Sequence, residues 1–423
     1  MKPHLLRFTP IVVATVLTLF YILVVVHFGY AARVDEILFW YPDTATYISV
    51  ADWIAQGTPT PHTLNRPFLF PLLVAVSRAV AGNHGIWASQ VLLWLASGIL
   101  LYCSLYRFCA RLWLALAGVA VFAANLTLLL LTLHVLTETL TLFLLCVGLT
   151  VVAYHRRMGE VVFRSCLLAV GALLTVTKPV FLGLFFPALL FALLGFKRLT
   201  TRKAVITMGS MLLLAASPVL VQVGIMKARH NTFSISRIGT VTVNRYAFAA
   251  LYGGLNHLTL EQARESVEQY STAQMLAYVL RRPGPAWQVW RQFIRANLNA
   301  GSATTDLPGR QRLLSRLMKR VNSVYYHLHL VMILPVVLSL FLAWKQKKRD
   351  LFSKLLMLLV PVLLVFGSSG LTFRQADRLV SPVLPVWLVL YALVFTVLIR
   401  WIRSGKLDPI PGSPGLVGPT QNQ

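Results

Sequence analysis

The sequence contains 423 residues, of which 57% are hydrophobic and only 12% are charged. Because a soluble domain of ordinary composition carries about 25% charged residues, this composition excludes a soluble globular protein and indicates an integral membrane protein. Lys and Arg outnumber Asp and Glu by 39 to 13, which gives a formal net charge of +26. The sequence has no basic soluble domain, so we expect this charge to face membrane lipids and we expect no binding to nucleic acid.

Apolar segments long enough to cross a bilayer as helices recur along the whole chain. The first follows Lys2 and Arg7 and is longer than the core of a signal peptide, so we interpret it as an uncleaved anchor with a cytoplasmic N-terminus. The fold class is therefore an all-α polytopic membrane helix bundle. The ten predicted spans are 9–28, 86–106, 111–131, 135–154, 161–177, 179–196, 203–225, 326–344, 351–367 and 380–400.

One further apolar segment, 67–80, is short, follows Arg66 and contains Arg78. If this segment does not cross, the positive-inside rule places every basic cluster between the spans in the cytoplasm, whereas a crossing would move several clusters outside. We therefore predict that 67–80 lies in, or dips into, the outer interface. This topology puts both termini in the cytoplasm and two long segments, 29–85 and 227–325, on the outer face.

The first outer loop, 29–85, concentrates acidic residues in a chain that has few of them. Asp43 follows a proline and is placed to cap a helix that begins near Thr44, and Gly57 is placed to end that helix. Tyr47 and the apolar residues after it then share one face. The sequence predicts a short amphipathic helix at the membrane surface.

The second outer segment, 227–325, is strongly basic, which the positive-inside rule tolerates in long loops. Within it, 260–279 and 286–298 show helical periodicity with apolar residues on one side. Arginines flank Trp287 and Trp290, a mixture that suits helices on a lipid headgroup layer. Helices that only pack against the bundle are an equal alternative.

The chain after the last span changes composition. It is rich in Pro and Gly and has no apolar periodicity, which is typical of a disordered tail. The sequence therefore divides into a transmembrane bundle over 1–400, which includes both outer segments, and a disordered cytoplasmic tail over 401–423.

Several short motifs on the predicted outer face follow one another across the whole transmembrane region. They are Asp43, Tyr47, Ala51 and Gly57, then Arg66-Pro67-Phe68-Leu69, then Leu136-Thr137-Glu138-Thr139-Leu140, and finally Arg378-Leu379-Val380-Ser381-Pro382 with Pro385. In this order they resemble the GT-C superfamily of membrane glycosyltransferases, which includes protein O-mannosyltransferases and bacterial lipid A aminoarabinose transferases. The chain departs from the family pattern at Thr44, where a second acidic residue is common, and at Leu379, where many members have tyrosine.

The resemblance implies an enzyme that moves a sugar from a polyprenyl-phosphate donor to a hydroxyl of a lipid, glycan or protein acceptor, with inversion at the anomeric carbon. The acceptor hydroxyl must lose a proton as it attacks, and a partly desolvated carboxylate at the membrane boundary, with its basicity raised, can take it. Asp43 is the candidate base. The leaving phosphate needs cationic donors, and the further candidates fall into two groups. The candidates for phosphate binding are Arg378, Arg374, Lys178 and Arg66, and the other site candidates are Glu138, His134 and Tyr47.

Each candidate also has a purely structural explanation. Asp43 can be a simple helix cap, or Asp35 and Glu36 can supply the carboxylate, although their spacing to the motif that follows fits less well. Glu138 can pair with an arginine, His134 can be a satisfied interfacial residue, and the cations can extend to lipid headgroups. The sequence indicates no certain cofactor, and it leaves open a divalent metal held by Asp43 with Glu138 or His134.

Two other functions suit a basic polytopic membrane protein. A transporter or flippase usually shows internal repeats and charged or broken helices near the membrane midplane, whereas the ionisable residues here gather at the outer boundary. A ligase or polymerase of lipid-linked glycans would use arginines of 227–325 and does not need the acidic motif of the first loop. We therefore prefer the glycosyltransferase, placed in a bacterial inner membrane, with the endoplasmic reticulum as the alternative.

Overall fold

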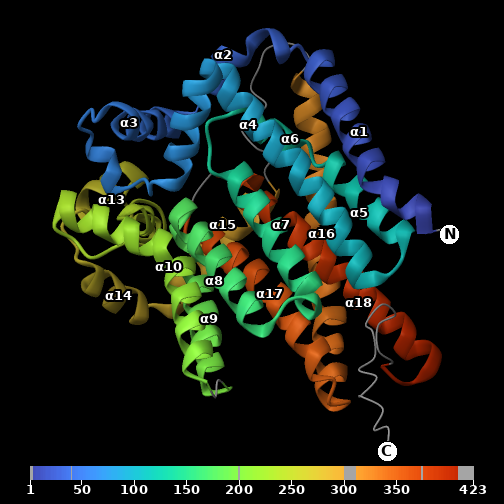
Figure 1. Ribbon diagram of the computed structural model, residues 1–423. Coiled ribbons are helices and arrows are strands. Elements are labelled where there is room, and N and C mark those ends of the chain that lie inside the picture. The colour runs from blue at the N-terminus through green and yellow to red at the C-terminus, as the bar shows by residue number, and fades with distance from the viewer. Residues whose placement is uncertain (1–2, 40, 199–200, 300–310, 373–374, 408–423) are drawn as a thin grey trace, which may run out of the picture.

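The computed structural model describes residues 3–39, 41–198, 201–299, 311–372 and 375–407. Within these ranges all regular secondary structure is helical, and the long helices run alongside one another in a bundle (Figure 1). Nine of the described helices are long and apolar enough to cross a membrane, or ten spans if one bent helix pair counts as a span. The predicted class, an integral membrane bundle of many helices, is confirmed.

The long helices coincide with the predicted spans to within a few residues at most ends. The main exception is the helix predicted over 326–344, which already begins at Gln311. The long helices are α1 (Pro3–His27), α4 (Leu69–Cys109), α7 (Glu138–Tyr154), α8 (Glu160–Thr177), α9 (Leu182–Leu193), α10 (Arg202–His230), α16 (Gln311–Lys345), α17 (Arg349–Ser369) and α18 (Leu384–Ser404).

The span predicted over 111–131 is the bent pair. Its two halves, α5 (Leu112–Ala124) and the helix that starts with α6 (Leu126–Leu130), meet at an angle of 59°. Asn125 between them has a non-helical backbone, and its side-chain oxygen accepts the N–H of Leu128. Asn125 therefore caps a new helix instead of continuing the old one.

The segment predicted to lie in the outer interface forms the first part of α4. The helix is interrupted at Ala81 and Gly82, where Gly82 has a φ of 59° that glycine adopts without steric cost. The break separates 69–80 from the span that follows, as the sequence predicts. The depth of 69–80 in the membrane stays a prediction.

The first outer loop forms α2 (Val34–Leu38) and α3 (Pro42–Gln56). The N-cap of α3 is Tyr41 and a proline fills the first helical position, so the prediction that Asp43 caps a helix near Thr44 is wrong. Asp43 lies in the first turn, where its side chain is available for other partners. The glycine after α3 ends the helix with a φ of 75°, as predicted.

The second outer segment forms a small group of helices beside the bundle, on the same side as α3 in Figure 1. The predicted helix over 260–279 is two helices, because Ser271 and Gln274 form a capping box that starts a second one. The elements are α11 (Ile238–Thr242), a π-helical turn (Val243–Phe248), α12 (Ala249–Asn256), α13 (Leu260–Val267), α14 (Thr272–Leu280) and α15 (Pro283–Asn299).

In α15 the two tryptophans have different surroundings. Trp290 donates its indole N–H to the carbonyl of Gly367 at 2.9 Å, whereas Trp287, stacked on it at 4.7 Å, is 58% exposed. The helix thus packs against α17 and also presents an apolar ring outward. At the C-terminal end α18 continues to Ser404, four residues into the predicted tail, and 408–423 lie outside the described residues.

Close packing of small and aromatic residues holds the bundle together. A Cβ at Gly98 would lie 2.4 Å from Cδ1 of Leu17 and 3.2 Å from the ring of Phe122, so a larger residue at this position would force side chains between α1, α4 and α5 to shift. Trp94 is fully buried and stacks on Phe122 with ring centroids 5.3 Å apart. These contacts make the bundle a firm support for the loops at its end.

Candidate functional site

A cavity of about 340 Å³ opens where the outer segments meet the bundle. Its walls come from α3, the start of α7, the turn between α8 and α9, the loop between α17 and α18, and the π-helical turn. Residues separated by up to 335 positions in the sequence meet there. Six of the candidate site residues line it, namely Asp43, Tyr47, Arg66, Glu138, Lys178 and Arg378.

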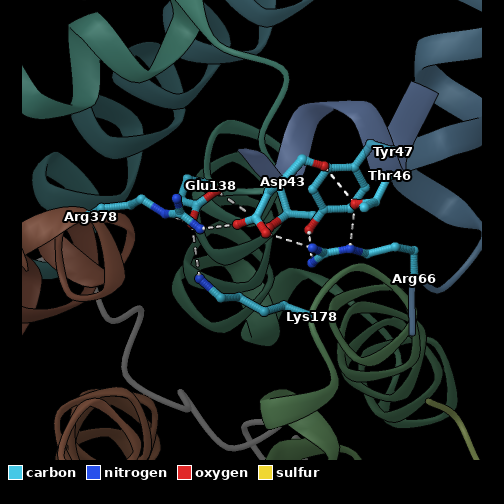
Figure 2. A network of polar contacts seen from close by, with 8 residues as sticks. Asp43, Thr46, Tyr47, Arg66, Glu138, Lys178 and Arg378 are labelled. Atoms are coloured by element: carbon cyan, nitrogen blue, oxygen red, sulfur yellow. Dashed lines mark hydrogen bonds and ion pairs between the residues drawn. The ribbon is translucent and has the colours of Figure 1, made fainter. Parts of the chain in front are cut away.

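Asp43 lies between two guanidinium groups, as Figure 2 shows. Arg66 donates Nη2 to Oδ1 at 2.6 Å, and Arg378 donates Nη2 to Oδ2 at 2.8 Å. Burial by itself raises the pKa of the Asp43 carboxyl, but the charges of Arg378 and Arg66 outweigh burial and lower the pKa below its usual value. The prediction that desolvation makes this carboxylate more basic is therefore wrong for the site without a ligand.

Glu138 is the second carboxylate of the cluster, at the first position of α7 and 1% exposed. Its Oε1 accepts from Nε of Arg378 at 3.0 Å and from Nζ of Lys178 at 3.4 Å. Arg378 thus bridges the two carboxylates, with Asp43 on one edge and Glu138 on the other. The pairing of Glu138 with an arginine, weighed above as a structural explanation, occurs inside the cavity.

Arg66 is fixed from several directions. It donates Nε to the hydroxyl of Thr46 at 2.9 Å and Nη1 to the hydroxyl of Tyr47 at 3.2 Å, and its guanidinium lies 4.5 Å from the centre of the Tyr47 ring. Tyr47 itself is buried on α3, one turn after Asp43. The planar fork of an arginine suits such multiple contacts, so α3 holds Arg66 and Asp43 together as one unit.

Local sequence explains how the cations reach the cavity. Lys178 precedes Pro179, and a residue before proline disfavours the helical conformation. Its backbone is extended (φ −143°, ψ 106°), so α8 ends there and Lys178 lies at the rim of the bundle. Arg378 lies in a short turn, Ala376–Leu379, which leads to the proline-containing turn before α18.

Three of the residues weighed above, His134, Asp35 and Glu36, are not part of the cavity wall. His134 is buried, with Nδ1 3.0 Å from the carbonyl of Ile37, and burial lowers the pKa of its imidazole to about 4. Asp35 accepts from the amide of Asn83 at 3.1 Å, and Glu36 pairs with Arg33 at the surface. The last of the predicted phosphate-binding residues, Arg374, lies outside the described residues.

The cavity also contains polar residues that the sequence analysis missed. Asn65 has a buried Oδ1 without a hydrogen-bond partner among the described residues. Arg245 and Tyr246 come from the π-helical turn, a geometry often found at functional sites. Asn65 stands next to the Arg66 motif, which was the only available signal, whereas nothing in the sequence distinguishes the π-helical turn from the rest of its segment.

The described side chains show no ready-made metal site. No group of three His, Cys, Asp or Glu residues among them comes close enough together to hold an ion. The two carboxylates of the cavity, on Asp43 and Glu138, are each engaged by two cations instead. This arrangement can bind an anion if one of the cations releases a carboxylate oxygen and donates its hydrogen bond to an oxygen of the anion instead.

Comparisons with known proteins find no relative. No family model matches the chain, and no curated protein or solved structure matches it. The function must therefore be inferred from the cavity and the helices around it.

Proposed function

We propose that the protein is a GT-C-type glycosyltransferase that moves a sugar from a polyprenyl-phosphate donor to an acceptor hydroxyl. The observation that carries this proposal is a carboxylate, Asp43, held between two arginines in a cavity at the end of an apolar helix bundle. Such a site combines a proton acceptor with cations for a phosphate leaving group. A lipid-linked donor gives a reason for the site to lie in a membrane protein.

The charges of the cluster suit a phosphodiester. Three cations, Arg66, Lys178 and Arg378, face two carboxylates, Asp43 and Glu138, which leaves one positive charge in excess. A sugar joined to a lipid through a single phosphate carries one negative charge. Arginine and lysine form strong charge-assisted hydrogen bonds with phosphate oxygens, so a monophosphate-linked donor would neutralise the cluster.

An apolar groove of about 300 Å³ supports the lipid part of this proposal. It shares α7, α8 and α17 with the charged cavity and lies further along them from the loops. Along α7, Glu138 and Thr141 line the cavity, and Leu145 and Leu149 line the groove. α9 follows the turn at Lys178, and α17 precedes the loop to α18. Both of these connections line the cavity, and both helices line the groove. A polyprenyl chain in the groove would hold its phosphate next to the cations.

The proposed reaction begins with an exchange of partners. When the donor phosphate accepts hydrogen bonds from Arg378 and Lys178, Asp43 loses one of its two arginines, and its basicity rises. Asp43 then takes the proton of the acceptor hydroxyl as that oxygen bonds to the anomeric carbon. The bond from this carbon to the phosphate oxygen breaks, and polyprenyl phosphate leaves. A single displacement of this kind inverts the anomeric carbon.

We further infer that the cavity faces the extracytoplasmic side of a bacterial inner membrane. The cavity lies at the loop ends of α7, α8, α17 and α18, and basic clusters mark the opposite ends. These clusters include His155–Arg157, Lys345–Arg349 and Arg400–Lys406. The positive-inside rule assigns such clusters to the cytoplasm, which supports cytoplasmic termini.

The test uses purified protein in vesicles and a panel of radiolabelled polyprenyl-phosphate sugars with acceptor lipids, glycans and peptides. We expect one donor to be consumed in an acceptor-dependent way, and we expect Asp43→Asn to abolish consumption while membrane insertion persists. The matched control is Asp52→Asn, because Asp52 lies on the same helix and pairs with Arg78 outside the cavity. Full activity of Asp43→Asn would refute Asp43 as the base, and donor that crosses the vesicle unchanged would indicate a transporter.

A further inference from the structure

The two arginines that hold Asp43 are themselves attached to segments of irregular backbone. Arg66 lies between a short turn, Pro61–Leu64, and the start of α4, and Arg378 lies in the loop between α17 and α18. Such connecting segments make only a few backbone hydrogen bonds of their own, such as the one from the N–H of Arg66 to the carbonyl of His62 at 2.9 Å, and in other proteins they move more than helices do. Something outside these segments must therefore fix their backbones if the arginines are to keep their geometry.

Asn297 fixes the segment that carries Arg378. It is fully buried at the end of α15, and its Nδ2 donates to the carbonyls of Ser369 at 2.8 Å and Thr372 at 2.9 Å. Its Oδ1 accepts the backbone N–H of Gln375 at 3.1 Å. One carboxamide thus connects the end of α17 with Gln375, which lies three residues before Arg378.

Gln222 has the matching role for Arg66. It lies in α10 and is 1% exposed. Its Oε1 accepts the backbone N–H of Phe68 at 3.0 Å, two residues after Arg66, and its Nε2 donates to the carbonyl of Ile235 at 2.8 Å. This side chain therefore ties the first outer loop to the start of the second outer segment.

We propose that Asn297 and Gln222 are positioning residues that set the two arginines around Asp43. A carboxamide can donate and accept at once, and a buried carboxamide with both functions satisfied adds rigidity at no cost in unpaired groups. Neither side chain is among the residues that line the cavity, so each acts through the backbone of an arginine. Because Asn297 belongs to the second outer segment, the same contact couples that segment to the cation that binds donor phosphate. This last point rests on the proposed function.

The experiment uses the full-length protein in lipid nanodiscs with two independent measurements. Hydrogen–deuterium exchange of the peptide that contains Gln375 reports the backbone contact whatever the protein does. Titration with undecaprenyl phosphate, used as the probe, reports the geometry of the cations. For Asn297→Ala we expect about tenfold faster local exchange, since a protecting contact is lost, and about 10- to 100-fold weaker probe binding, since small misplacements of a site are costly. Gln222→Ala should weaken probe binding in the same way and speed exchange near Phe68.

Two further variants keep the result interpretable. Asn256→Ala is the matched control, because Asn256 is an exposed carboxamide on α12 that donates to the carbonyl of Tyr252, and it should change neither measurement. Trp290→Phe removes the indole hydrogen bond to Gly367 and keeps an aromatic ring against α17, so it should give a smaller change in the same direction even if Asn297→Ala folds poorly. Unchanged exchange in Asn297→Ala and Trp290→Phe would overturn the positioning role. Faster exchange in a protein whose wild type binds no probe would uphold that role and refute the donor proposal instead.

Discussion

Neutralising Glu138 tests the ion-pair network on which the site depends. In Glu138→Gln, three cations would face a single carboxylate, that of Asp43. Two unit charges about 4 Å apart interact by about 4 kcal/mol at an effective dielectric constant of about 20, and breaking a buried pair costs about 3–5 kcal/mol in measured cases. Because the side chains of Glu138 and Arg378 are only 1% and 11% exposed, solvent screens the pair little. We expect a loss of about 3 kcal/mol in the free energy of unfolding.

The double variant sharpens this expectation. Arg378→Gln alone leaves Glu138 with Lys178 only, at 3.4 Å, and leaves Asp43 with Arg66. When Glu138 and Arg378 are both replaced, both charges of their ion pair are removed together. Neither residue is then left as an unpaired buried charge by loss of the other. The combined loss should therefore fall short of the sum of the two single losses by about 2–3 kcal/mol.

Unfolding in mixed micelles with increasing SDS, followed by far-ultraviolet circular dichroism, measures these differences. The control cycle uses Asp52→Asn and Arg78→Gln, a pair at 3.0 Å whose side chains are 36% and 44% exposed. Exposed pairs contribute less than about 1 kcal/mol, so this cycle should show little coupling. Additive losses in the Glu138 and Arg378 cycle, or single losses no larger than those of the control pair, would refute a buried bridging arginine.

Three further predictions concern the proposed reaction. First, the arginines lower the pKa of the Asp43 carboxyl against the effect of burial. Asp43 of the free protein should therefore stay ionised at pH values below the usual carboxyl pKa of about 4. The acid limb of kcat/KM should then lie at lower pH than that of kcat, because donor binding removes Arg378 from Asp43; coincident limbs in the two pH profiles would argue against the exchange. Second, Lys178→Met should raise the KM for donor about tenfold or more through loss of a charged hydrogen bond, whereas Lys354→Met, at the opposite end of the bundle, should leave it unchanged. Third, Ala188→Phe, in the apolar groove, should weaken binding of long-chain polyprenyl donors and spare a short farnesyl analogue, and equal effects on both would place the lipid elsewhere.

The helices were largely predictable because their signal is local. A long run of apolar residues indicates a helix in the lipid bilayer, and clusters of basic residues mark the cytoplasmic ends of such helices. The errors occurred where one polar or cyclic side chain decides the backbone. Asn125 looks like a tolerated polar residue within an apolar run, yet its side chain starts a new helix. At α3, the proline before Asp43 takes the first helical position, which shifts the cap to Tyr41.

The sequence predicted most of the residues of the site, but it did not predict which of them contact one another. Motif order singled out Asp43, Arg66 and Arg378, and topology added Lys178, because each of these follows from short patterns. Arg378 bridges two carboxylates that lie 240 and 335 residues away from it in the sequence. No local sequence pattern can predict contacts over such separations. Asn297 was missed for the same reason, since a carboxamide in a loop helix looks ordinary until the backbone that it contacts is known.

The two ends of Arg378 have different surroundings, and this difference suits the proposed exchange. Its Nε faces Glu138, which is 1% exposed, whereas its Nη2 faces Asp43, which is 33% exposed. An incoming phosphate can approach the Asp43 side more readily, and displacement there leaves the buried contact with Glu138 intact. Glu138 would then serve as the anchor that keeps Arg378 in place while its other end changes partner. Without a donor, the same arginine keeps Asp43 a weak base, so under the proposed function proton abstraction begins only after the phosphate has bound.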